Sequence, residues 1–301
     1  MSKFAIGILV ALLAGAVVYV TSFNAGPPAS SSRACSNIAS ASEYCLQSNL
    51  SSLTLRPNVP VTLSLAVLNN VGDVIKSFSV SHDKLLHLIA VRDDLSSFQH
   101  LHPEFDNTTG EFTLPALSFP EPGPYRVFAE FVPDDPPNVS SAPQSKTLSE
   151  NIIVAGAYLP RPLGSPQTTQ LIDGYSVSLA SDRAPDASGA VMMSFTLKKD
   201  GELVTNLEPY LAALGHSVVL KEGSLEYIHA HALQEPSAPQ NGIIAFHVDF
   251  PSAGNYKVFT QFKHEGEVHT VEFVVPVSNS IPSGPDDQMD HRMHIRHPDV
   301  L

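Results

Sequence analysis

Hydrophobic residues occur in short runs along most of the chain, and glycine, proline, asparagine and aspartate separate the runs. Runs of this kind, spaced by about ten residues, are typical of strands in an antiparallel β-sandwich. No segment after residue 24 has the length and period of an amphipathic helix. The pattern therefore predicts an all-β fold. The expected strands span 61–68, 84–92, 96–102, 110–119 and 124–132, and then 190–198, 214–221, 225–231, 242–250, 255–263 and 267–277.

The second half of the chain repeats the first. An offset of 129 residues relates His87, His100 and His102 to His216, His229 and His231. After a two-residue insertion, an offset of 131 relates Phe119, Gly123, Tyr125, Phe128 and Phe131 to Phe250, Gly254, Tyr256, Phe259 and Phe262. Matches at two fixed offsets indicate two copies of one domain. We expect two tandem Ig-like antiparallel β-sandwiches after an N-terminal transmembrane or signal helix.

The N-terminal segment Phe4–Phe23 carries no charged residue over twenty positions. This length suits an uncleaved transmembrane anchor, whereas Val20 and Ser22 are small enough for signal-peptide cleavage before Phe23. Lys3 places the short side in the cytoplasm. The body is then expected outside the cytoplasm, periplasmic or extracellular: membrane-anchored with the helix retained, secreted with it cleaved.

The expected domain division follows from these boundaries. It comprises an anchor or signal peptide at 1–23, a Ser/Ala/Pro-rich linker at 24–50, a first sandwich at 51–155, a linker at 156–168, a second sandwich at 169–278 and a Met- and His-containing disordered tail at 279–301.

Each copy holds a hairpin that carries three histidines. With Asp93-Asp94 at the tip of the first hairpin, His87 faces His100, and with Glu222-Gly223 at the tip of the second, His216 faces His229. Side chains alternate along a strand, so His100 and His102 share a face, as do His229 and His231.

Three imidazoles at such separations can converge on one ion, and neutral imidazole suits copper, zinc or nickel. The predicted metal ligands are therefore His87, His100, His102, His216, His229 and His231. The alternative is packing, because Ile89, Val91 and Phe98 on the same face are typical of a sandwich core.

The amino-acid composition limits which classes of molecule the protein is expected to bind. Seventeen Lys and Arg against thirty Asp and Glu give a net charge of −13, which argues against nucleic acid as a partner. The two cysteines, Cys35 and Cys45, are expected to form a local disulfide in an oxidising compartment. The tail offers further candidate copper ligands, alongside the alternative of a polar tail without a site: Met289, His291, Met293, His294 and His297.

The string from His87 to Pro103, of pattern H-L-x-x-x-R-x-D-L-x-x-F-x-H-x-H-P, resembles a recurrent motif of exported bacterial β-domain proteins linked with heavy-metal or copper handling. Residues 119–128 look like the companion half of that motif. The whole is also similar, in architecture, to YtkA-like and copper-resistance sandwich domains. The resemblance implies an Ig-like fold and metal association for His87, His100 and His102. In the second copy Ala232 stands where the first copy has Pro103.

The leading hypothesis is an exported metal-binding protein that acts in copper delivery, buffering or resistance, tethered to the membrane by its N-terminal helix and serving an envelope protein that transports or receives the metal. The alternative is a metal-free tandem Ig-like interaction or scaffold module. No nucleophile elbow, phosphate loop or dinucleotide fingerprint is present, so an enzyme is not expected, apart from a minor hypothesis of metal-dependent hydrolysis. His264 and His269 lie five apart with strand character, which does not suit a zinc protease.

Overall fold

The computed structural model describes residues 43–134, 144–233, 237 and 239–279, which belong to one compact unit. Antiparallel strands form almost all of its regular secondary structure, as predicted, and the one helical turn among these residues is η1 (Leu50–Ser52). Repeat 1 contains β1 (Tyr44–Ser48), β2 (Val61–Asn69), β3 (Phe78–Ser79), β4 (Leu86–Arg92), β5 (Phe98–Leu101), β6 (Glu104–Asp106), β7 (Glu111–Leu117), β8 (Gly123–Pro133) and β9 (Lys146–Val154). Repeat 2 contains β10 (Thr169–Ile172), β11 (Tyr175–Ser181), β12 (Val191–Lys199), β13 (Glu202–Leu203), β14 (His216–Lys221), β15 (Tyr227–His231), β16 (Ile243–Val248), β17 (Gly254–His264) and β18 (Glu267–Val277).

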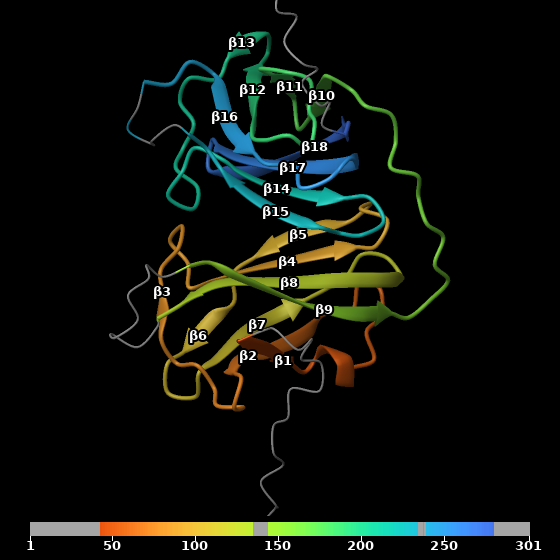
Figure 1. Ribbon diagram of the computed structural model, residues 1–301, viewed down its shortest axis with the longest axis vertical. Helices are drawn as coiled ribbons and strands as arrows, with labels where there is room; N and C mark the ends of the chain where they lie inside the picture. The colour runs from red at the N-terminus through yellow and green to blue at the C-terminus, as the bar shows by residue number, and fades with distance from the viewer. Residues whose placement is uncertain (1–42, 135–143, 234–236, 238, 280–301) are drawn as a thin grey trace, which may run out of the picture. The chain divides into compact units, whose positions relative to one another are not determined.

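Repeat 1 is a sandwich of two sheets. One has the strand order β1-β2-β7-β6, and the other has the order β3-β8-β4-β5 with β9 added beside β8 (Figure 1). Alternate residues of each sheet point into a shared core, for example Leu65 and Val67 of β2 and Leu88 and Ala90 of β4. Burial of this apolar face, at about 25 cal/mol per Å², is the main force that holds the two sheets together.

Repeat 2 has the same design. Its sheets are β10-β11-β12-β13 with β16 beside β12, and β15-β14-β17-β18. Phe195, Phe246 and Phe273 meet in the core between them. The duplication seen in the sequence is therefore a duplication of the sandwich.

Both sandwiches carry a tyrosine near the start of an equivalent strand, Tyr125 on β8 and Tyr256 on β17. The Tyr125 hydroxyl donates a hydrogen bond to the Glu121 carbonyl at 3.1 Å, and the Tyr256 hydroxyl donates one to the Ser252 carbonyl at 2.8 Å. Such a tyrosine corner recurs in Ig-like sandwiches.

The histidine hairpins are paired two residues away from the predicted register. Ile89, and not His87, lies opposite His100, and Val218 lies opposite His229. The predicted facing of His87 with His100, and of His216 with His229, is therefore wrong. A shift of two residues leaves every side chain on its predicted face.

The cause of this shift is a four-residue turn in place of a two-residue one. In repeat 1 the Arg92 amide donates to the Ser97 carbonyl at 3.0 Å, and Leu95 adopts a φ of 61° with its side chain fully buried. In repeat 2 the left-handed leucine is Leu225, with a φ of 54°, and it lies one position further along the turn, which is again four residues long. A left-handed leucine is unusual, and burial of its side chain against the other repeat offsets the backbone strain.

The outer faces of the two histidine sheets pack against each other. Ile89, Val91 and Phe128 of repeat 1 form one apolar cluster with Val218 and other residues of repeat 2. The expectation that Ile89 and Val91 belong to the core of their own sandwich is wrong. Their strand alternates between its own core and the neighbouring repeat, which is why all seven residues of β4 are buried.

Aromatic pairs at this contact obey the repeat symmetry. Phe98 stacks on Phe259 with 4.2 Å between ring centroids, and Phe128 stacks on Tyr227 at 4.9 Å. The sequence offsets relate Phe98 to Tyr227 and Phe128 to Phe259. The two stacks are therefore equivalent, and the interface has pseudo-two-fold symmetry.

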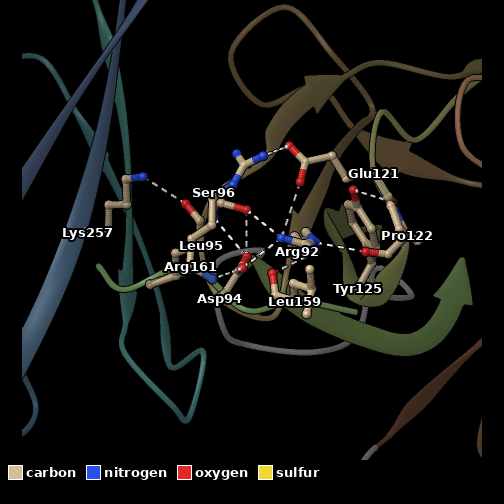
Figure 2. A network of polar contacts seen from close by, with 10 residues as sticks. All are labelled: Arg92, Asp94, Leu95, Ser96, Glu121, Pro122, Tyr125, Leu159, Arg161 and Lys257. Carbon is tan, nitrogen blue, oxygen red and sulfur yellow. Dashed lines mark hydrogen bonds and ion pairs between the residues drawn. The ribbon is translucent and has the colours of Figure 1, made fainter. Parts of the chain in front are cut away.

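A buried arginine closes one edge of this interface (Figure 2). Arg92 is 2% exposed, and its Nη1 donates to Asp94 Oδ2 at 2.7 Å while its Nε donates to the Pro122 carbonyl at 3.0 Å. The Arg161 amide of the inter-repeat segment donates to the same Asp94 oxygen at 2.8 Å, and Lys257 of repeat 2 donates to the Leu95 carbonyl. Burial would raise the pKa of Asp94, but the hydrogen bonds of Arg161 and Ser96 and the charge of Arg92 lower it.

Several predictions concern residues outside the described part. The segment 1–23, Cys35 and the tail ligands, Met289 to His297, lie there, and Tyr44–Ser48 forms a strand where composition indicated a linker. Cys45 is disulfide-bonded, which agrees with the expectation for it, while its pairing with Cys35 stays a prediction. No helix in the described residues is long and apolar enough to cross a membrane.

Candidate metal centre

Three histidines of repeat 1 converge at the inter-repeat face. His87 lies on β4, His100 lies on β5, and His102 directly follows β5. His87 Nδ1 is 3.1 Å from His100 Nε2 and 3.2 Å from His102 Nε2, and the three candidate ligand atoms all lie within 4.8 Å of one another. The structure thus brings together the first predicted set.

Hydrogen bonds on the outer side of two rings determine which nitrogen faces inward. His87 Nε2 donates to the Ser81 carbonyl at 3.0 Å, which leaves Nδ1 as the nitrogen with a lone pair. His100 Nδ1 donates to Gln261 Oε1 at 2.7 Å, which leaves Nε2. The Gln261 amide is itself oriented, because its Nε2 donates to Thr270 Oγ1 at 3.0 Å. Two lone pairs are thereby directed at one point.

The triad is held in its neutral form. Burial lowers the pKa of His87 to about 4, and burial together with the neighbouring His102 lowers that of His100 to about 2. Burial and the nearby His87 lower the pKa of His102 to about 3. Neutral imidazole is the form that binds a metal, so protons do not compete for these nitrogens near pH 7.

The spacing fits a metal ion. Two nitrogens that share a tetrahedral ion at bond lengths of roughly 2.0–2.1 Å lie about 3.3 Å apart. The separations of His87 Nδ1 from His100 Nε2 and from His102 Nε2, 3.1 and 3.2 Å, are close to that value. A positive ion between the lone pairs would also remove their mutual repulsion. The donor set, which is imidazole alone, suits copper, zinc or nickel.

The corresponding histidines of repeat 2 lie beside the triad. The ring of His229 is 5.7 Å from that of His216 and 5.7 Å from that of His87, centroid to centroid. His216 Nε2 bonds to the Leu211 carbonyl at 2.9 Å, as His87 bonds to a preceding loop. His231 ends β15 opposite His216, and its side chain lies outside the described part. Among described residues, only the repeat 1 set brings three ligand atoms within 4.8 Å, so the second set stays a prediction.

A family model described as a domain of unknown function, DUF8832, matches residues 40–142 and again residues 169–279, together more than half of the chain. The chain belongs to the DUF8832 family. The first match covers β1–β8 and the second covers β10–β18. The two-fold repetition found in the sequence is therefore a tandem pair of DUF8832 domains.

Solved structures show weak similarity. A variant of Salmonella alpha-2-macroglobulin is 13% identical with a TM-score of 0.24, over 79% of this chain and 15% of that chain. A marsupial T cell receptor is 11% identical with a TM-score of 0.21, over 80% and 75%. A Parabacteroides merdae beta-glucuronidase is 11% identical with a TM-score of 0.20, over 77% and 24%. This chain thus spans well under two thirds of the first and third proteins. No curated protein matches the chain.

Sequence reasoning missed three residues at the centre of the DUF8832 pair. They are His82, Glu130 and Gln261. The ring of His82 lies 5.3 Å from that of His216 and 6.2 Å from that of His87. It sits in the loop before β4, where no strand period could have placed it. Glu130 and Gln261 occupy one position of the repeat, offset by 131, and that equivalence was available as a signal.

Glu130 of repeat 1 is the carboxylate that bonds to His229 of repeat 2. Its Oε2 accepts hydrogen bonds from His229 Nδ1 at 2.7 Å and from the Tyr227 hydroxyl at 2.8 Å. Burial would raise the pKa of Glu130, but the hydrogen bond and the charge of His229, together with the hydrogen bonds of Tyr227 and Ser145, outweigh it and lower the pKa to about 2. Burial and the Glu130 charge raise the pKa of Tyr227. Glu130 is therefore ionised near pH 7, with its carboxylate against the ring of His229.

The pair rejected as a zinc protease motif has a packing role. His264 and His269 lie on the two arms of the β17–β18 hairpin and not on a helix. His264 bonds to the Tyr175 hydroxyl at 2.7 Å and to Asn206 at 3.0 Å, and His269 bonds to Asp173 at 3.0 Å. Their strand context agrees with the prediction.

Proposed function

We propose that this protein binds a transition-metal ion, with copper as the first candidate and zinc or nickel as the others, at His87, His100 and His102. The observation that carries the proposal is the inward direction of two lone pairs, set by the Ser81 carbonyl and by Gln261, toward a third imidazole. Copper is favoured because divalent ions on nitrogen ligands follow an order of affinity that peaks at Cu(II).

The wider role proposed is metal delivery, buffering or resistance outside the cytoplasm. The resemblance of residues 87–103 to the motif of exported copper-handling β-domains supports it, as does the apolar segment 4–23, which would anchor or export the chain. A transport or receiving protein of the envelope is the proposed partner. The equivalent tyrosine corners support the finer assignment of both repeats as Ig-like.

Metal titration of the purified protein tests the proposal. The wild type is expected to bind Cu(II) stoichiometrically by equilibrium dialysis, and His100→Ala is expected to lose the site. His247→Ala is the matched control, because His247 is exposed on β16 away from the triad. A wild type that binds no Cu(II) above background would instead support the rival function, a metal-free interaction module, and equal binding by the wild type and His100→Ala would contradict the triad as the site.

A further inference from the structure

Each repeat contributes one residue that orients a histidine of the other. Gln261 of repeat 2 accepts from His100 Nδ1 of repeat 1, and Glu130 of repeat 1 accepts from His229 Nδ1 of repeat 2, both at 2.7 Å. Gln261 and Glu130 are the same position of the duplicated unit, as are His229 and His100. The two repeats are therefore joined by two equivalent hydrogen bonds, and each repeat supplies the acceptor in one of them and the histidine in the other.

The exchange follows from the strand alternation that builds the interface. On β17, Phe259 and Gln261 point to the neighbouring repeat, while Val258 and Phe262 point into the core of their own sandwich. On β8, Phe128 and Glu130 likewise point to the neighbouring repeat. The stack of Phe98 on Phe259 lies on the same pair of strands as the bond of His100 to Gln261. Because the two contacts share these strands, packing of Phe98 on Phe259 places the Gln261 amide within hydrogen-bond distance of the His100 imidazole.

An acceptor at Nδ1 decides which nitrogen of a neutral imidazole can bind a metal. With the proton held on Nδ1, the lone pair is on Nε2, and the Nε2 of His100 faces His87. Gln261 cannot rotate freely to reverse this choice, because its own amide nitrogen donates to Thr270 Oγ1. Among the residues that the structure describes, none of repeat 1 is hydrogen-bonded to His100 Nδ1.

We propose that Gln261 is a positioning residue for the metal site of the other repeat, so that the site is complete only when the two repeats are docked. The inference rests on the proposed metal binding. Residues acting on the far nitrogen of a metal-binding histidine typically change affinity by 10–100-fold. Gln261→Leu removes the acceptor and is expected to weaken Cu(II) binding by a factor in that range.

The position also allows a rescue. Gln261→Glu keeps an acceptor at the same place and adds the charge that Glu130 carries in the other direction. A carboxylate partner raises the basicity of the imidazole. Gln261→Glu is therefore expected to bind Cu(II) at least as tightly as the wild type, although it changes the same side chain.

The test combines two readouts on the full chain. Long-range ¹⁵N–¹H spectra of the metal-free protein report the tautomer of His100, which is expected to carry its proton on Nδ1 in the wild type and in Gln261→Glu, and to lose that preference in Gln261→Leu. Equilibrium dialysis with Cu(II) then compares the affinities. Lys257→Met, which removes another contact between the repeats, and Glu130→Gln, at the equivalent position, are controls that should leave the His100 tautomer unchanged.

The outcomes separate the two proposals. If the wild type binds no Cu(II), the proposed function fails, while the tautomer spectra still decide whether Gln261 sets the state of His100. An unchanged tautomer and affinity in Gln261→Leu would overturn the positioning role. If that variant does not fold, a loss of affinity in Gln261→Glu overturns it equally.

Discussion

Acidification should destabilise the metal-free protein, and His100 should carry a defined part of that effect. Burial lowers the pKa of His100 to about 2 in the folded protein, whereas a histidine in an unfolded chain titrates near 6.5. Between these values the unfolded chain binds a proton that the folded chain does not. Stability is therefore retained above pH 6.5 and decreases as the pH falls below it.

The magnitude follows from the distance between the pH and the unfolded pKa. At about pH 5 the gap is roughly 1.5 units, which at 1.36 kcal/mol per unit corresponds to about 2 kcal/mol for one histidine. This is an upper value, since His100 is half-buried and water screens part of the burial effect. Total stabilities of domains are about 5–15 kcal/mol, so the change is measurable.

Urea unfolding in the presence of a chelator, at about pH 7.5 and about pH 5, measures the effect. The difference in free energy of unfolding between His100→Gln and the wild type is expected to shift in favour of the variant by up to about 2 kcal/mol between the higher and the lower pH. The exposed His247 serves as the control, and His247→Gln should show no such shift. If the wild type and His100→Gln differ in free energy of unfolding by the same amount at both pH values, the burial of His100 does not cause the loss of stability in acid.

Three further predictions concern the metal, the interface and the tail. A Cu(II) concentration about 100-fold above the dissociation constant should stabilise the wild type by about 2.7 kcal/mol in thermal unfolding; His87→Ala should abolish this gain and His247→Ala should keep it. Arg92→Ala should lower the free energy of unfolding by about 3–5 kcal/mol, because it leaves a buried carboxylate without its partner. The exposed Arg161→Ala should lower it by less than about 1 kcal/mol, and equal effects of the two would contradict this account. Deletion of 279–301 should reduce the number of bound copper ions measured by mass spectrometry, and an unchanged number would exclude the tail as a site.

Much of the fold can be predicted from the sequence, because strand alternation shows within each short segment and the duplication shows when the two halves are compared. The strands that carry His87 and His100 appear close to where the pattern puts them, and the face shared by His100 and His102 follows from alternation alone. The register does not follow, because it depends on a left-handed Leu95 whose side chain is buried between the repeats.

The residues that complete the site were harder to predict from the sequence. Ile89 has the apolar character of a core position whether it faces its own sandwich or the neighbouring repeat, so hydrophobicity alone cannot tell the two apart. Gln261 and Glu130 act on histidines 161 and 99 residues away along the chain. Their roles depend on how two sandwiches dock, which no period within one strand encodes.

The exchanged contacts have a consequence for how such a centre can diversify. Two identical one-repeat chains meeting about a true two-fold axis would be obliged to present the same residue from both sides. Covalent fusion of the copies lifts that obligation, and this chain uses the freedom by setting glutamate at residue 130 against glutamine at residue 261. One polypeptide can thus keep a symmetric scaffold while giving its two histidine sets unlike electrostatic surroundings.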